Sequence, residues 1–168
     1  MKRFLKIALV AIALSASSVY AGDLEFLLGP RIDVTNYGTN FFTTGLAYGG
    51  KYLKFGLNYS HASPANVSYN GFKPYVMIDI PLGFGGFAIA PTIDLGPEIG
   101  FAAGRKIIDV MVLGFGLKAQ YYFTDMLGVG ITPVHFSNSF ATYTTGVPGF
   151  VKQHRMSYDL FFSLLLKW

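Results

Sequence analysis

Apolar and polar residues alternate along most of the chain, and the alternation is most regular at the carboxyl terminus. In residues 158–168 every second side chain is large and apolar or aromatic, whereas the positions between them are mixed. A period of two is typical of a β-strand with two unlike faces. Six large apolar side chains on one face suit a strand that borders lipid. The alternative interpretation is a buried edge strand of a soluble β-sandwich.

The same alternation, interrupted by turn-rich segments, predicts seven further strands. The eight predicted strands cover residues 23–35, 41–48, 51–61, 72–82, 87–101, 107–123, 127–137 and 158–168. Short turns are expected after the second, fourth and sixth strands. Longer loops are expected after the first, third and seventh, and the longest of them covers residues 138–151. This spacing predicts an all-β fold, an eight-stranded antiparallel up-and-down transmembrane β-barrel.

Four prolines fall within or near the predicted strands. They are Pro74, Pro81, Pro91 and Pro133. Proline cannot donate the hydrogen bond that a central strand requires, and a closed barrel has no free edge strand to accommodate it. We therefore expect β-bulges or strand ends at these positions.

The amino-terminal residues 1–21 have the parts of a signal peptide. A basic start is followed by the short apolar core 7–14 and by small residues before Gly22. This core is too short for a transmembrane helix but is typical of a secretory signal. Cleavage would leave residues 22–168 as one barrel domain with ten basic and nine acidic residues. We therefore expect an exported protein of the bacterial outer membrane, and the nearly balanced charge argues against nucleic acid as a partner.

Charged residues occupy the strand faces opposite the apolar ones. The side chains predicted to face the interior are Glu25, Arg31, Asp33, Lys54, Lys73, Asp79, Asp94, Glu98, Lys118, Asp159 and Lys167. Six of them are acidic and five are basic, and a buried charge without a partner is strongly destabilising. The near balance predicts an ion-paired interior that plugs the barrel, because eight strands leave little lumen. A polar pore or a proton path is the alternative.

One short motif could carry chemistry, at the end of the seventh predicted strand. His135 and Ser137 share the alternation of Val129 and Ile131, so both are expected to point outward towards lipid. Polar side chains there can be satisfied by water and headgroups at the loop rim. They can also form a histidine–serine pair, in which the imidazole activates the hydroxyl for acyl transfer.

The sequence His135-Phe136-Ser137-Asn138 resembles the His-x-Ser-Asn motif of the lipid A 3-O-deacylases, a family of eight-stranded outer-membrane barrels. The resemblance implies a hydrolase with His135 as base, Ser137 as nucleophile and Asn138 stabilising the oxyanion. The substrate would be an ester-linked acyl chain of lipid A, reached from the outer leaflet. The family also has a glutamate near the start of the last strand. The best-matching position here is Met156, and Asp159 is expected to face inward.

The aromatic carboxyl terminus resembles the terminal signature that barrel-insertion machinery reads in bacterial outer-membrane proteins, with Trp168 in place of the usual phenylalanine. Expected partners are therefore this machinery and outer-membrane lipid, lipid A among them, for a monomer or small homo-oligomer. No cofactor or metal site is expected, because His61, His135 and His154 are isolated in the sequence and cysteine is absent.

These observations lead to two functional hypotheses. The first is an integral outer-membrane β-barrel with a plugged interior, whose extracellular loops serve a structural or surface-interaction role. The second is an ester hydrolase related to the lipid A deacylases that acts through His135 and Ser137.

Overall fold

The computed structural model describes residues 22–35, 40–62, 68–102, 104–144, 150–151 and 155–168. The predicted signal peptide 1–21 and His154 lie outside the described residues. The strands have the bounds β1 (Asp23–Asp33), β2 (Asn40–Gly49), β3 (Leu53–Ala62), β4 (Tyr69–Asp79), β5 (Leu82–Phe84), β6 (Phe87–Ala102), β7 (Arg105–Tyr122), β8 (Leu127–Ser139), β9 (Thr142–Thr144), β10 (Phe150–Val151) and β11 (Arg155–Lys167). No helix that could cross a membrane occurs in this part of the chain.

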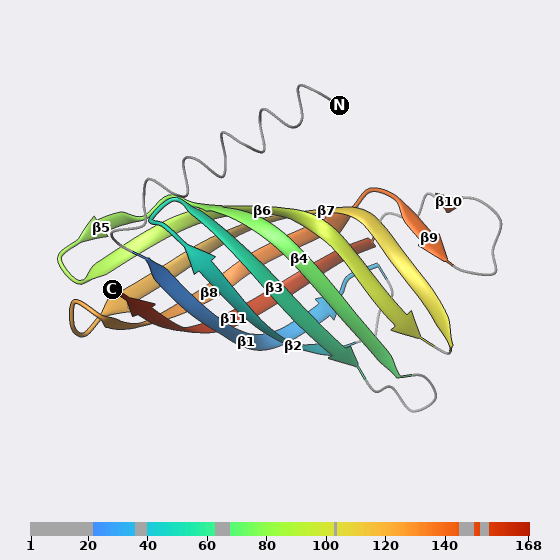
Figure 1. Ribbon diagram of the computed structural model, residues 1–168, viewed down its shortest axis with the longest axis horizontal. Coiled ribbons are helices and arrows are strands. Elements are labelled where there is room, and N and C mark those ends of the chain that lie inside the picture. The colour runs from blue at the N-terminus through green and yellow to red at the C-terminus, as the bar shows by residue number, and fades with distance from the viewer. Residues whose placement is uncertain (1–21, 36–39, 63–67, 103, 145–149, 152–154) are drawn as a thin grey trace, which may run out of the picture.

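Eight long strands of the described chain close into one antiparallel barrel (Figure 1). Each long strand pairs with the long strands before and after it, in the ring order β1, β2, β3, β4, β6, β7, β8 and β11. The ring closes where β1 pairs with β11, from Asp23 opposite Lys167 to Asp33 opposite Ser157. The predicted fold class, an eight-stranded antiparallel up-and-down barrel, is confirmed.

Three short strands extend this ring. β5 lies beyond Pro81 and pairs with β6, so it continues β4 after a break. β9 follows β8 in the chain and, like β8, pairs with β7. β10 pairs with β9. The prediction that residues 138–151 form a loop is therefore wrong in part, because they include the end of β8 and these two short strands. β6 and β7 also extend into the segment left between the predicted strands 87–101 and 107–123, where Ala102 pairs with Arg105 and Gly104 has a φ of 73°.

The two ends of the barrel differ. β1 starts and β11 finishes at one end, here called the terminus end, on the left in Figure 1. The connections β2 to β3, β4 to β6 and β7 to β8 are also at the terminus end. The opposite end, here called the loop end, carries β9, β10 and the connections that include residues outside the described part.

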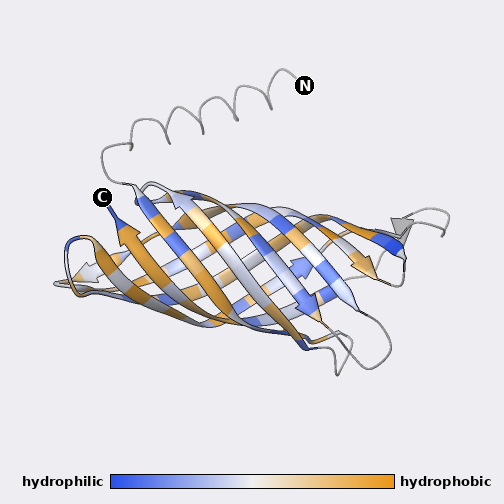
Figure 2. Cartoon of the chain, turned by 60° about the horizontal axis from the view of Figure 1, so that its bottom comes forward, coloured by the Kyte–Doolittle hydropathy of each residue, from blue (hydrophilic) through white to orange (hydrophobic). Residues whose placement is uncertain are grey.

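The barrel is apolar outside and charged inside. The side chains of Phe26, Leu57 and Phe162, for example, are 43%, 50% and 48% exposed, whereas Glu25, Lys54 and other charged residues are buried. Figure 2 shows apolar and polar residues interspersed along the strands of the barrel. A soluble domain has the opposite distribution, since burial of apolar surface stabilises it. An outer wall of this kind is stable only where an apolar medium surrounds it.

A β-bulge in β8 changes which side chains face inward. Pro133 and Val134 are both exposed, and the register between β8 and each neighbour shifts by one residue at this position. The expectation of a bulge or strand end is confirmed at Pro133, and also at Pro81, which lies between β4 and β5. Pro91 lies within β6, beside the break that follows β4. Regular pairing between β4 and β6 ends at Thr92, so the missing N–H of Pro91 removes no backbone hydrogen bond between these two strands.

Candidate functional site inside the barrel

The bulge turns the predicted motif towards the interior. His135 is 8% exposed and Ser137 is 3% exposed, and both lie on the inner face of β8. The prediction that they point outward towards lipid is wrong. One extra residue at Pro133 reverses the alternation that Val129 and Ile131 establish earlier in the strand, because the side-chain period of a strand is two.

The His135 ring lies between two carboxylates. Its Nδ1 is 2.8 Å from Asp159 on β11, and its Nε2 is 2.6 Å from Asp94 on β6. Where both carboxylates are ionised they can only accept, so both ring nitrogens then donate and the ring is an imidazolium. Gly114 of β7 makes room for the contact with Asp94, since a Cβ atom there would lie 2.1 Å from the Asp94 carboxylate.

These two carboxylates continue into a chain of charges across the barrel. Asp94 also accepts from Lys73, and Asp159 lies 3.1 Å from the Nε of Arg31. Arg31 in turn donates to both oxygens of Glu98, at 3.0 and 3.1 Å. We call this set the central ion chain; it consists of Lys73, Asp94, His135, Asp159, Arg31 and Glu98. With His135 as an imidazolium, it contains three positive and three negative charges.

Ser137 has different partners from His135. Its hydroxyl lies 2.6 Å from the hydroxyl of Ser157 and accepts a hydrogen bond from Arg31 at 3.3 Å. Asn138 lies on the other face of β8, and its side-chain oxygen is buried and accepts no hydrogen bond from the described residues. The structure thus brings Asp159 to His135 and Ser157 to Ser137, and none of the described hydrogen bonds joins the His135 and Ser137 side chains.

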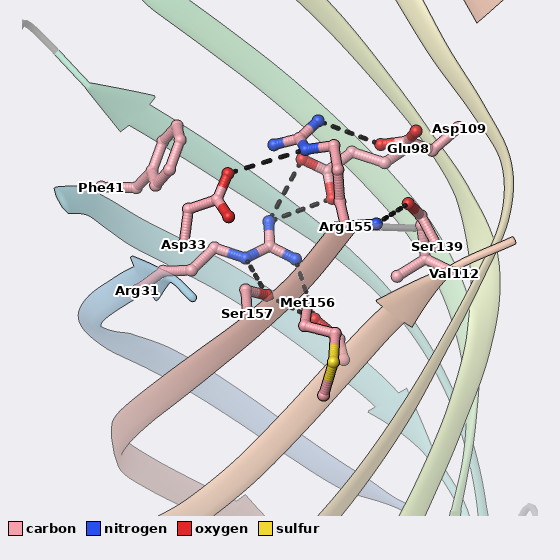
Figure 3. A pocket seen from close by; sticks show the side chains of 11 residues that line it. Arg31, Asp33, Phe41, Glu98, Asp109, Val112, Ser139, Arg155, Met156 and Ser157 are labelled. Carbon is pink, nitrogen blue, oxygen red and sulfur yellow. Dashed lines mark hydrogen bonds and ion pairs between the residues drawn. The ribbon is translucent and has the colours of Figure 1, made fainter. Parts of the chain in front are cut away.

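A second cluster closes the barrel interior near the loop end (Figure 3). Arg155 donates to Asp109 at 3.1 Å and lies 3.8 Å from Asp33, and Thr142 of β9 also donates to Asp109. A cavity of about 20 Å³ lies between these residues and the Arg31–Glu98 pair, which is room for about one water molecule. Asp109 and Arg155 were not predicted to face inward.

A third cluster, the terminus-end cluster, contains Glu25, Lys54, Asp79 and Lys118. Lys54 lies 3.2 Å from Glu25 and 3.3 Å from Asp79, and Lys118 lies 3.0 Å from Glu25 and also bonds Asp79. Both lysines therefore contact both acids in a square of alternating charge, and Asp23 also lies 3.8 Å from Lys54. A cavity of about 30 Å³ separates it from His135 and Asp94. No group of three or more metal-ligating side chains occurs among the described residues.

Ten of the eleven side chains predicted to face the interior are buried there. The exception is Lys167, which is exposed, with its amino group 5.4 Å from the centre of the Tyr122 ring. Lys167 lies opposite Asp23 and shares the alternation of the buried Ser163 and Leu165, so it is on the inner face but is exposed because it is the last residue of β11, at the open terminus end.

The fold is shared with solved outer-membrane barrels. The neisserial surface protein A (NspA) superimposes with a TM-score of 0.55 at 9% sequence identity, over 88% of this chain and 96% of that chain. The N-terminal β-barrel domain of Pseudomonas aeruginosa OprF gives a TM-score of 0.54 at 10% identity, over 87% and 97%. No family model and no curated protein sequence matches this chain. At these identities the likeness shows the fold alone, that of a small eight-stranded barrel.

Proposed function

We propose that this chain is an integral protein of the bacterial outer membrane, delivered by the signal peptide 1–21 and inserted by the barrel-assembly machinery that reads its aromatic carboxyl terminus. The loop end then faces outward and provides a structural or surface-interaction role, as a monomer or small homo-oligomer. The observation that carries the proposal is the reversed polarity, with exposed apolar side chains outside and buried, paired charges inside.

The three groups of ion pairs support a plugged interior. They follow one another along the barrel from the terminus-end cluster, through the central ion chain, to Arg155 and Asp109 near the loop end. Between them lie cavities of about 20 and 30 Å³, which have room for about one or two water molecules each.

The proposal is tested by expressing the full chain in a Gram-negative host and separating the two membranes. We expect the protein in the outer-membrane fraction, with faster electrophoretic migration before boiling than after, as folded barrels show. Reconstituted in planar lipid bilayers, it should give no stable ionic conductance. Recovery in the inner membrane or in soluble form would contradict the assigned location, and a steady open-pore current would contradict the plugged interior.

The alternative proposal, an ester hydrolase acting on lipid A, gains one supporting contact. Asp159 hydrogen-bonds His135, so a carboxylate can orient the imidazole although the matching position Met156 carries none. However, the contacts of Asp94 with the second ring nitrogen and of Ser157 with Ser137 favour the structural proposal. For catalysis both bonds would have to be exchanged, and an acyl chain would have to enter the interior.

Mass spectrometry of lipid A from cells that express the protein separates these two proposals. The structural proposal predicts unchanged lipid A, identical to that from cells expressing the Ser137→Ala variant. Loss of one ester-linked acyl chain, abolished by Ser137→Ala in a protein that still migrates as a folded barrel, would establish the hydrolase instead.

A further inference from the structure

A groove of about 390 Å³ lies on the apolar outer wall and crosses the strands β6, β7, β8 and β11. Large apolar side chains border it, and the small residues Ala119 and Gly130 lie between them. Gln120 and Ser163 also line the groove. Because their side chains are buried in the barrel interior, their main chain forms part of the groove floor. The bordering apolar side chains are Phe87, Tyr121, Val129, Ile131 and Phe162.

Ala119 is the residue that opens the groove. It lies on the outer face of β7 between Leu117 and Tyr121, which are 45% and 48% exposed. Its partners on the neighbouring strands are the larger Ile89 of β6 and Ile131 of β8. A single methyl group among large side chains leaves a hollow, and an empty hollow loses the dispersion contacts of its lining. The groove therefore gains contacts when a slender apolar chain fills it.

The groove rises from the terminus end towards the middle of the outer wall. Phe87 is the first residue of β6, and Tyr121 is the last residue but one of β7. Ile131 is the fifth residue of β8, and Phe162 lies six residues before the carboxyl terminus. The groove crosses three strand intervals of about 4.8 Å each, or about 14 Å in all. In a membrane-spanning barrel, an acyl chain follows the same course from the membrane surface into the hydrocarbon.

The mouth of the groove lies beside two turns of the terminus end. Gly85 and Gly86 join β5 to β6, and residues 123–126 join β7 to β8. The turns are adjacent, because the Tyr122 N–H donates to the Gly86 carbonyl oxygen at 2.8 Å. The charged residue of the two turns is Asp125, which is exposed. A carboxylate there is complementary to an ammonium group and repels an anionic headgroup.

We propose that the groove binds one acyl chain of a phosphatidylethanolamine in the membrane leaflet at the terminus end, with the headgroup ammonium beside Asp125. A second copy of this chain fits the groove less well, because a closed barrel presents a convex wall that cannot fill a hollow across four strands. The inference rests on the proposed membrane location and adds a lipid-binding site on the outer wall.

Native mass spectrometry of the purified full chain in detergent tests this proposal. The probes are phosphatidylethanolamine and phosphatidylglycerol with identical acyl chains. Ala119→Phe fills the groove and Ala119→Val fills part of it, whereas the control Val76→Phe adds a ring to the exposed outer face of β4. Asp125→Asn removes the charge at the mouth, and its control is Lys51→Gln in the turn between β2 and β3. Folding of each variant is checked by heat-modifiable migration.

We expect phosphatidylethanolamine to bind more tightly than phosphatidylglycerol. Ala119→Phe should weaken its binding about tenfold, since the loss of about ten carbon–carbon contacts amounts to that factor. Ala119→Val should weaken it less. Asp125→Asn should reduce the preference for phosphatidylethanolamine by about two- to fivefold, the effect of one exposed charge pair. Val76→Phe and Lys51→Gln should match the unaltered protein.

Equal affinity of the two Ala119 variants and Val76→Phe, or equal binding of the two lipids by the unaltered protein, would overturn the proposal. A dimer of the unaltered protein that Ala119→Phe dissociates would also overturn it and would assign the groove to a second copy. These measurements use purified protein, so they do not depend on where the cell delivers it. The outer-membrane location stands or falls on the fractionation experiment alone.

Discussion

The Nδ1 atom of His135 lies 2.8 Å from the carboxylate of Asp159, its direct partner across the β8–β11 ladder. The same imidazole contacts Asp94 of β6 through its other nitrogen. His135 on β8 thus links β11 to β6, which is three places from β11 around the ring, so it contributes to contacts across the interior as well as to charge balance.

Removing this imidazole should destabilise the barrel. His135→Gln leaves Asp94 and Asp159 buried without the cation between them, and breaking a buried pair costs about 3–5 kcal/mol. Urea unfolding of the folded protein in lipid vesicles, followed by the fluorescence of the single tryptophan Trp168, measures the change. The control is His61→Gln on the outer wall. Equal stability of the two variants would contradict the role assigned to His135.

The terminus-end cluster makes a related prediction for Lys118. Lys118→Met leaves Glu25 and Asp79 with only Lys54 as a cation, so we expect a loss of about 3–5 kcal/mol. Adding Asp79→Asn removes the excess negative charge and should restore part of the loss, which a double-mutant cycle quantifies. If the changes in the free energy of unfolding caused by the two substitutions simply add in the double variant, the four charges do not act as a unit. Lys51→Met, outside the cluster, should change stability little.

Two glycines mark places where neighbouring strands approach closely. A Cβ atom at Gly29 would lie 1.8 Å from the carbonyl oxygen of Leu160, and one at Gly96 would lie 1.9 Å from that of Pro74. Gly29→Ala and Gly96→Ala should therefore force backbone shifts and lower stability by about 1–3 kcal/mol or more. At Gly83 the nearest atom would be 3.6 Å away, so Gly83→Ala is the matched control. The prediction is wrong if all three variants unfold at the same urea concentration.

A charged side chain near the middle of the outer wall should lower the stability of the barrel. Leu57 lies in the centre of β3 and is half exposed, so Leu57→Arg would place a cation in hydrocarbon at a cost of about 2–4 kcal/mol in a bilayer. Phe84→Arg adds the same charge in β5 at the terminus end and should cost little. The comparison is made by urea unfolding in lipid vesicles. Equal costs at the two positions would argue against a lipid-facing wall at Leu57.

Alternation of polarity was enough to predict the eight strands and ten of the inward charges, because a period of two fixes both the strand and its faces. It failed at His135 and Ser137, since one extra residue in β8 reverses the faces beyond it. Pro133 indicated a bulge, but not which later residues would turn inward. Asp109 was missed for the same reason, because β7 has an extra residue at Val110 and Met111.

The contacts inside the barrel could not be predicted from the pattern. Arg155 lies between the predicted loop 138–151 and the predicted strand 158–168, and its bond to Asp109 depends on how far β11 and β7 extend at the loop end. The contact between His135 and Asp94 joins strands that are not neighbours in the ring and passes over Gly114. The faces of the strands follow from local alternation, whereas these partners depend on register around the whole barrel.

The central claim is that the barrel crosses the outer membrane with its loop end outside. The chain has no cysteine, so single cysteines can report each end without background. Intact cells are treated with a membrane-impermeant maleimide after introducing Arg105→Cys at the loop end or Asp125→Cys at the terminus end. We expect labelling of the Arg105→Cys variant in intact cells and of the Asp125→Cys variant only after lysis. Labelling of Asp125→Cys but not Arg105→Cys in intact cells, or of neither before lysis, would contradict it.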